Sequence, residues 1–251
     1  MVYFFLIPLF LCWGSFLNVV AYRLIADIPF FTARSRCPLC NTQLPWYTTI
    51  PLISWIWLRG MCHVCTQKIS LLYPFIESLT VILFLCLLLC VSSQWWPAYM
   101  IFFSALIITI RTDLEFMLIS RFASIFLIPV AFSAAYFNFL PLSIIESVCA
   151  ALVGYSSFYL CNILFTYITQ KNGIGEGDME LMAFIGAVIG IVGWWITILI
   201  GSLLGSIIGV CYILYTQKNS SVRLPFGPFL ALGAIIYVLF ASYFHTWLLM
   251  S

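Results

Sequence analysis

Long apolar blocks alternate with short polar stretches along this chain. A helix needs about 20 mostly apolar residues to cross a bilayer. The pattern therefore predicts an all-α polytopic membrane protein in which residues 23–73 form the one sizeable polar insertion. The blocks predict eight membrane-spanning helices, at 2–22, 74–92, 97–112, 117–137, 142–168, 180–194, 196–216 and 225–246.

The composition agrees with lipid as the main solvent. Of the 251 residues, 64% are hydrophobic and 7% are charged, whereas soluble domains average about a quarter charged residues. The first apolar block has no basic stretch before it and ends in Arg23, so we interpret it as a retained helix rather than a cleaved signal peptide. The net charge of +2 does not indicate a nucleic-acid partner.

The cations predict the orientation of the chain in the membrane. Eight spans place alternate connections on opposite sides, and all 10 Lys and Arg residues fall in or beside connections of a single side. These residues are Arg23, Arg34, Arg36, Arg59, Lys68, Arg111, Arg121, Lys171, Lys218 and Arg223. Because cytoplasmic loops carry the excess of Lys and Arg, we expect this side to be cytoplasmic and both termini to lie outside.

Two Cys-x-x-Cys pairs stand in the polar insertion, at Cys37 and Cys40 and at Cys62 and Cys65. Each pair can point two thiolates at one metal ion, and four sulfurs complete a closed tetrahedral zinc site of the structural kind. Disulfides are rare in the cytoplasm, which favours zinc. Two disulfides, or a loop without metal, are the alternatives.

Two aspartates lie near the expected cytoplasmic boundary, Asp113 at the end of the third span and Asp178 before the sixth. Two neighbouring carboxyl groups share a proton, so one can activate water while the other polarises a carbonyl. Gly175 and Gly177 would let a substrate backbone approach Asp178. The alternatives are interfacial charges paired with nearby cations, or a neighbouring glutamate as the partner carboxylate.

The chain resembles the bacterial type IV prepilin peptidases, which are aspartic proteases with a Gly-x-Gly-Asp motif. The resemblance runs over nearly the whole chain. It is carried by residues 14–24, the two cysteine pairs, 46–47, 50–55, 58–60, 73–77, the Gly-x-Gly-Asp motif at 175–178, and 224–234.

The resemblance implies a function for each part. Asp113 and Asp178 would be the catalytic pair, supported by Gly175 and Gly177. The enzyme would cut basic leaders from type IV prepilins or pseudopilins after a Gly, at the cytoplasmic face of the bacterial inner membrane. It would then methylate the new N-terminus with S-adenosylmethionine. Residues 1–22 would be the first helix, 23–73 the zinc-binding region linked with methylation, and 74–251 a seven-helix peptidase domain.

Two positions depart from the family pattern. Glu180 stands where the family usually has Lys, two residues after the second Asp, and Ile119-Ser120 stands where a Pro-Asp pair often follows the first Asp. Such changes around the pair keep other functions open. These are a peptidase without methyltransferase activity, an inactive zinc-bearing assembly protein, and a proton-coupled transporter.

Overall fold

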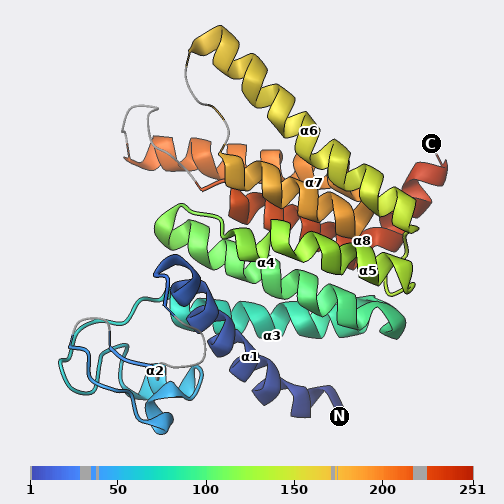
Figure 1. Ribbon diagram of the computed structural model, residues 1–251. Coiled ribbons are helices and arrows are strands. Elements are labelled where there is room, and N and C mark those ends of the chain that lie inside the picture. Colours follow the sequence, from blue (N-terminus) through green and yellow to red (C-terminus); the bar gives the residue numbers. More distant parts are fainter. Residues whose placement is uncertain are drawn as a thin grey trace. The chain divides into compact units, whose positions relative to one another are not determined.

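The computed structural model describes residues 2–28, 35–37, 40–170, 173, 175–216 and 225–250. Within these residues the chain is helical, with two isolated β-bridges and no strand, as the all-α prediction requires (Figure 1). The chain forms two compact units, Met1–Leu89 and Cys90–Ser251. We refer to them as the N-terminal and the C-terminal unit.

In the N-terminal unit, α1 (Val2–Ile25) packs antiparallel against α3 (Leu72–Cys90). The rings of Phe10 and Phe84 are 5.3 Å apart, and the Asn18 side chain donates a hydrogen bond to the Tyr73 carbonyl (3.2 Å). Gly14 lets the helices approach, since a Cβ there would lie 2.9 Å from the α3 backbone. The insertion between them carries η1 (Trp46–Thr49) and α2 (Ile53–Trp57).

The centre of the C-terminal unit is built from α4 (Trp96–Phe116) and the first half of α7 (Glu176–Thr216). Every residue of 102–113 and of 179–190 is buried. Helices that are apolar on all sides take such central positions. Both central stretches lead directly to the aspartates marked in the sequence, because Asp113 ends the first and Asp178 precedes the second.

Helix α7 doubles back on itself at Gly190. That residue takes a left-handed conformation (φ 75°, ψ −179°), which glycine adopts without a steric penalty. Near the beginning of α8 (Gly227–Met250), Phe229 contacts Gly201 of α7, while Gly227 is hydrogen-bonded to Asp113, a neighbour of Asp178. A straight helix would hold positions 178 and 201 about 35 Å apart, so the two halves must lie antiparallel.

This reversal separates the sixth and seventh predicted spans, at Gly190 rather than near residue 195. Among the described residues, five helices are long and apolar enough to cross a membrane: α1, α3, α4, α6 (Ile144–Thr169) and α7. Two shorter apolar helical stretches, Arg121–Tyr136 and Gly227–Ala241, accompany them. With α7 counted as two, the described chain has the predicted eight apolar helical segments.

The predicted span 117–137 is not one continuous helix. Met117 ends α4 in the left-handed conformation, and two 3-10 helices follow, η3 (Arg121–Ala123) and η4 (Ile125–Leu127). The helix α5 (Ile128–Tyr136) then begins with Pro129 in its first turn. Proline lacks a backbone N–H and favours a helix start over a helix interior, so the apolar run is divided.

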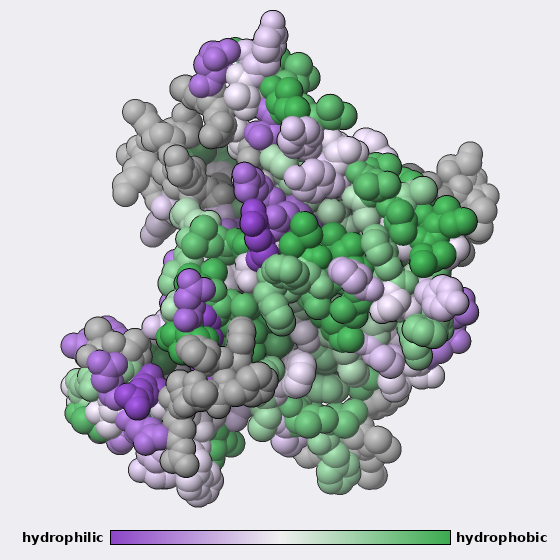
Figure 2. All heavy atoms as spheres, in the orientation of Figure 1, coloured by the Kyte–Doolittle hydropathy of each residue, from purple (hydrophilic) through white to green (hydrophobic). Residues whose placement is uncertain are grey.

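Hydrophobic side chains cover much of the face seen in Figure 2. Large apolar residues are exposed along the long helices, among them Leu152 on α6 and Leu199 and Leu203 on α7. A water-facing surface rarely carries apolar patches this extensive. The described surface therefore agrees with a lipid environment.

Close packing of α6 against α7 leads to a prediction about stability. A Cβ at Gly186 would lie 2.4 Å from the Ala150 carbonyl oxygen, whereas a Cβ at Gly205 would meet only the Phe229 ring, at 3.3 Å. We expect Gly186→Ala to cost about 1–3 kcal/mol by overpacking and to lower the melting temperature in detergent. Gly205→Ala, on the same helix, should leave it unchanged or raise it; equal melting temperatures would contradict the prediction.

Candidate active site

Asp113 lies in the last turn of α4 and is buried, with 6% of its surface exposed. Its backbone carbonyl accepts the N–H of Met117, which terminates the helix. Its carboxylate Oδ2 accepts a hydrogen bond from the backbone N–H of Gly227, at 2.9 Å. The end of α4 and the beginning of α8 therefore fix the position of this carboxylate.

Asp178 lies in the first turn of α7, where an acidic residue is favoured by the helix dipole. The backbone of Gly175 hydrogen-bonds its carboxylate. Its Oδ1 atom is buried and has no hydrogen-bond partner among the described residues. Buried polar atoms in folded proteins are nearly always paired with protein or water, so this oxygen points to a place for water or substrate.

The structure brings Asp113 and Asp178 together. The two carboxyl groups are close enough to interact electrostatically, although 64 residues of sequence lie between their positions in an otherwise apolar bundle. No cation lies between them among the described contacts. A carboxyl pair of this kind can hold one proton and use both protonation states in acid-base chemistry.

The two predicted motif glycines have different surroundings. Gly177 packs closely, since a Cβ there would lie 2.8 Å from the Ile119 Cβ. Gly175 is exposed, and the nearest atom to its Cβ position is the Asp178 Oδ2, at 3.4 Å. Gly177 therefore permits a close helix contact, and Gly175 keeps the approach to Asp178 open.

Sequence reasoning missed the part that Gly227 plays in this site. It lies within the 224–234 block, which we used only as a family signature. A backbone N–H donor leaves no trace in side-chain patterns, so only the occurrence of glycine in that block could have indicated it. A Cβ at Gly227 would lie 2.8 Å from the Asp113 Oδ2, so glycine is what allows the contact.

The four predicted cysteines form one cluster, in which all four sulfurs lie within 4.8 Å of one another. Two similar turns present them. The N–H of Asn41 bonds the Cys37 carbonyl and the N–H of Thr66 bonds the Cys62 carbonyl, and Asn41 and Thr66 are both left-handed (φ 55° and 56°). The Cys37 and Cys65 sulfurs are 3.8 Å apart.

This geometry fits a tetrahedral metal site. With a zinc–sulfur bond of about 2.3 Å, sulfurs of a tetrahedral site lie about 3.8 Å apart, as Cys37 and Cys65 do. Hydrogen bonds from the Thr42 side chain and backbone lower the pKa of Cys40 to about 6, and backbone hydrogen bonds from Cys65 and Val64 lower the pKa of Cys62. Both effects favour thiolates, the form that binds metal.

Four thiolates at this distance also repel one another. A backbone hydrogen bond from Gln67 favours the Cys65 thiolate, but burial and the other three sulfurs outweigh it and raise the pKa of Cys65 to about 11. A divalent cation at the centre would remove this repulsion. The cluster could therefore hold a metal ion.

A buried carboxylate anchors the insertion to the membrane helices of the N-terminal unit. Glu77 on α3 is 6% exposed, and its Oε2 accepts the backbone N–H of Leu52 at 2.9 Å. Leu52 has an unusual positive φ of 58° and forms the N-cap of α2. Glu77 therefore holds the strained start of α2 against α3.

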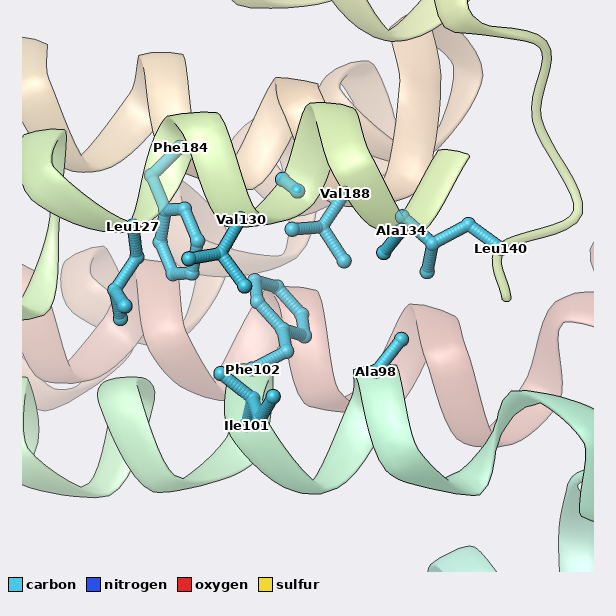
Figure 3. Close-up of a pocket in the computed structure, with 10 residues that line it drawn as sticks. Ala98, Ile101, Phe102, Leu127, Val130, Ala134, Leu140, Phe184 and Val188 are labelled. Atoms are coloured by element: carbon cyan, nitrogen blue, oxygen red, sulfur yellow. The ribbon is translucent and has the colours of Figure 1, made fainter. Parts of the chain in front are cut away.

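An apolar cavity of about 30 Å³ lies between α4, α5 and α7. Figure 3 shows Phe184 and Val188 of α7 directed toward Phe102 of α4, and the rings of Phe102 and Phe184 are 5.4 Å apart. The residues that line it include no titratable group. Asp113 lies about 16 Å further along α4, so this cavity is a packing defect and not the chemical site.

Comparison with known proteins gives two family matches and a set of relatives. The bacterial peptidase A24 N-terminal domain matches residues 9–91, and the type IV leader peptidase family matches residues 100–210. No solved structure matches the chain significantly.

Three relatives cover most of the chain. The prepilin leader peptidase/N-methyltransferase of Aeromonas hydrophila is 31% identical over 98% of this chain and 94% of its own length. The protein of the same name from Bacillus subtilis is 32% identical over 91% and 90%. A type 4 prepilin-like proteins leader peptide-processing enzyme of Escherichia coli is 31% identical over 88% of both chains.

Proposed function

Because the chain belongs to the type IV leader peptidase family, we propose that it removes the leader peptides of prepilins or pseudopilins with Asp113 and Asp178 as its catalytic pair. The family makes it a protease of the membrane, and the resemblance noted in the sequence is confirmed. One observation carries the residue assignment. The two aspartates meet at the ends of two central helices, where Asp178 Oδ1 is buried without a partner.

In the reaction we propose, the ionised carboxylate takes a proton from water, whose oxygen attacks the carbonyl carbon of the scissile peptide bond. The protonated carboxyl donates its proton to the carbonyl oxygen. The tetrahedral intermediate then collapses, the C–N bond breaks, and the leaving nitrogen receives a proton from the pair. Gly175, exposed beside Asp178, leaves room for the substrate backbone.

We further propose that cleavage follows a Gly, between a basic leader and a hydrophobic helix, at the cytoplasmic face of the bacterial inner membrane. The support is the charge pattern, since all 10 cations fall on one side of the eight-span arrangement. In that arrangement the cysteine cluster and both aspartates face the cytoplasm, and both termini are periplasmic. Type IV pili and type II secretion are the systems that such substrates serve.

For the insertion we propose structural zinc, bound by Cys37, Cys40, Cys62 and Cys65. Four protein ligands leave no open position for substrate. The printed name of the relatives includes an N-methyltransferase, so we propose that S-adenosylmethionine supplies a methyl group to the new N-terminus. We keep the division proposed from the sequence, with 1–22 as first helix, 23–73 as the region linked with methylation and 74–251 as the peptidase domain.

Co-expression with a prepilin tests the proposed function. The mature N-terminus of the pilin would be identified by mass spectrometry, which also detects an added methyl group. We expect a product that begins directly after the leader Gly and that is methylated. Uncut prepilin would overturn the peptidase assignment, and a cut but unmethylated product would overturn only the methyltransferase assignment.

Zinc content gives a separate prediction for the cysteine cluster. We expect the purified protein to contain about one zinc ion per chain, and Cys37→Ser or Cys62→Ser to remove most of it, as measured by elemental mass spectrometry. Cys211, an exposed lone cysteine on α7, offers the control, because Cys211→Ser should retain the metal. Zinc that stays bound in both cluster variants would exclude the four-sulfur site.

A further inference from the structure

Three charged side chains meet where the segment after α4 touches the first turn of α7. The Arg121 Nε lies 3.1 Å from the Glu180 Oε1 and its Nη2 lies 3.3 Å from the Glu176 Oε2. Ser124, fully buried, directs its hydroxyl to the Glu180 Oε2 at 3.5 Å. The two acids differ in exposure, since 9% of the Glu180 side chain is exposed and 84% of that of Glu176.

The same segment also contacts the turn that carries Asp178. Ile119 packs against Gly177, where a Cβ would lie 2.8 Å from the Ile119 Cβ. Contacts at positions 177 and 180 together fix both the place and the rotation of this first turn. Asp178 precedes Glu180 by two residues, which turns the two side chains about 200° apart on the helix, so an anchored Glu180 directs Asp178 away from Arg121.

Ile119 extends this contact to the other carboxylate. Its Cδ1 would lie 3.2 Å from a Cβ at Gly227, the residue whose N–H holds the Asp113 Oδ2. Residues 119–124 therefore touch the beginnings of both α7 and α8, next to both members of the aspartate pair.

We propose that Arg121 and Glu180 form an ion pair that positions Asp178 against Asp113, and that both are positioning residues for cleavage. This inference rests on the proposed function. It also accounts for the two departures from the family pattern. The expected acid near position 120 and the expected cation at 180 are both missing, and a cation at 121 and an acid at 180 form the contact with opposite polarity.

Burial decides which half of the contact matters. An exposed pair such as Arg121 with Glu176 contributes little, because water screens it and both side chains lose freedom. Glu180 is almost fully buried, and a buried carboxylate that loses its cation is left without compensation. The first turn of α7 must then shift or rotate, and Asp178 moves with it.

A charge exchange tests the inference on the full chain in detergent, with a prepilin as substrate. We expect Arg121→Glu and Glu180→Arg each to lower kcat at least about tenfold while KM stays within about threefold, because the pair orients the reacting group without binding substrate. The double variant Arg121→Glu/Glu180→Arg should recover most of the loss. Glu176→Gln, which removes the exposed partner of the same cation, should keep kcat within about twofold.

Several outcomes would overturn the inference. Single variants as active as the wild type would do so, as would a double variant no better than the worse single one, or a loss that lies wholly in KM. A double-mutant cycle on melting temperature measures the ion pair independently of activity, and zero coupling there would exclude it. A wild-type protein that leaves prepilin uncut would instead overturn the proposed function, which keeps the two failures distinguishable.

Discussion

Asp178→Asn and Asp113→Asn each reduce prepilin cleavage by roughly 10²–10⁴-fold, the contribution of a positioned acid or base. Asparagine keeps the size of the side chain but cannot ionise or exchange the shared proton. At Asp113 the amide oxygen can still accept the N–H of Gly227, 2.9 Å from the present Oδ2, so the local fold should be preserved. Initial rates with purified prepilin, at equal amounts of folded enzyme, measure the effect.

The matched control is Glu146→Gln, a carboxylate-to-amide change in the same unit. Glu146 closes a capping box with Ser143 at the start of α6, and glutamine serves in that motif as well as glutamate. This variant should cleave at the wild-type rate. If either Asn variant retained that rate as well, the aspartate pair would not be the catalytic centre, and a neighbouring carboxylate such as Glu115 would replace one member.

Much of the fold was predictable because lipid imposes long apolar helices, and these are visible directly in the sequence. The reversal of α7 was not located correctly, since the run around Gly190 is apolar on both sides and contains several other glycines. Only one of them takes the positive φ, and three-dimensional packing selects it. The break of span 117–137 had a visible signal in Pro129, which the length of the apolar run concealed.

The candidate site was predictable to a different extent. The cysteine pairs could be grouped from spacing alone, because two close pairs in a polar loop have few other uses. Asp113 and Asp178 could be marked as acids at helix ends, but their meeting depends on how α4 and α7 pack. The pairing of Arg121 with Glu180 and the hydrogen bond from Gly227 connect residues far apart in the chain, and neither has a local pattern.

The Gly227 contact gives the second large prediction. A Cβ at this position would lie 2.8 Å from the Asp113 Oδ2 and 3.2 Å from the Ile119 Cδ1. Relief of both contacts requires the carboxylate or the start of α8 to move by a large part of an ångström. A misplacement of about 1 Å in a catalytic group costs about 100-fold in rate, so we expect Gly227→Ala to lower kcat by about that factor.

Gly233→Ala separates this effect from a general loss of packing. It lies on the same helix, and its Cβ would be 2.7 Å from the Thr197 carbonyl oxygen, a backbone atom that cannot move easily. It lies about 9 Å along α8 from Gly227, so it should lower the melting temperature while the kcat of the folded fraction stays near wild type. Gly227→Ala should show the reverse, with a large loss of kcat and a smaller change in melting temperature. Parallel losses in both variants would mean that Gly227 serves helix packing alone, and that the Asp113 carboxylate is positioned without its N–H.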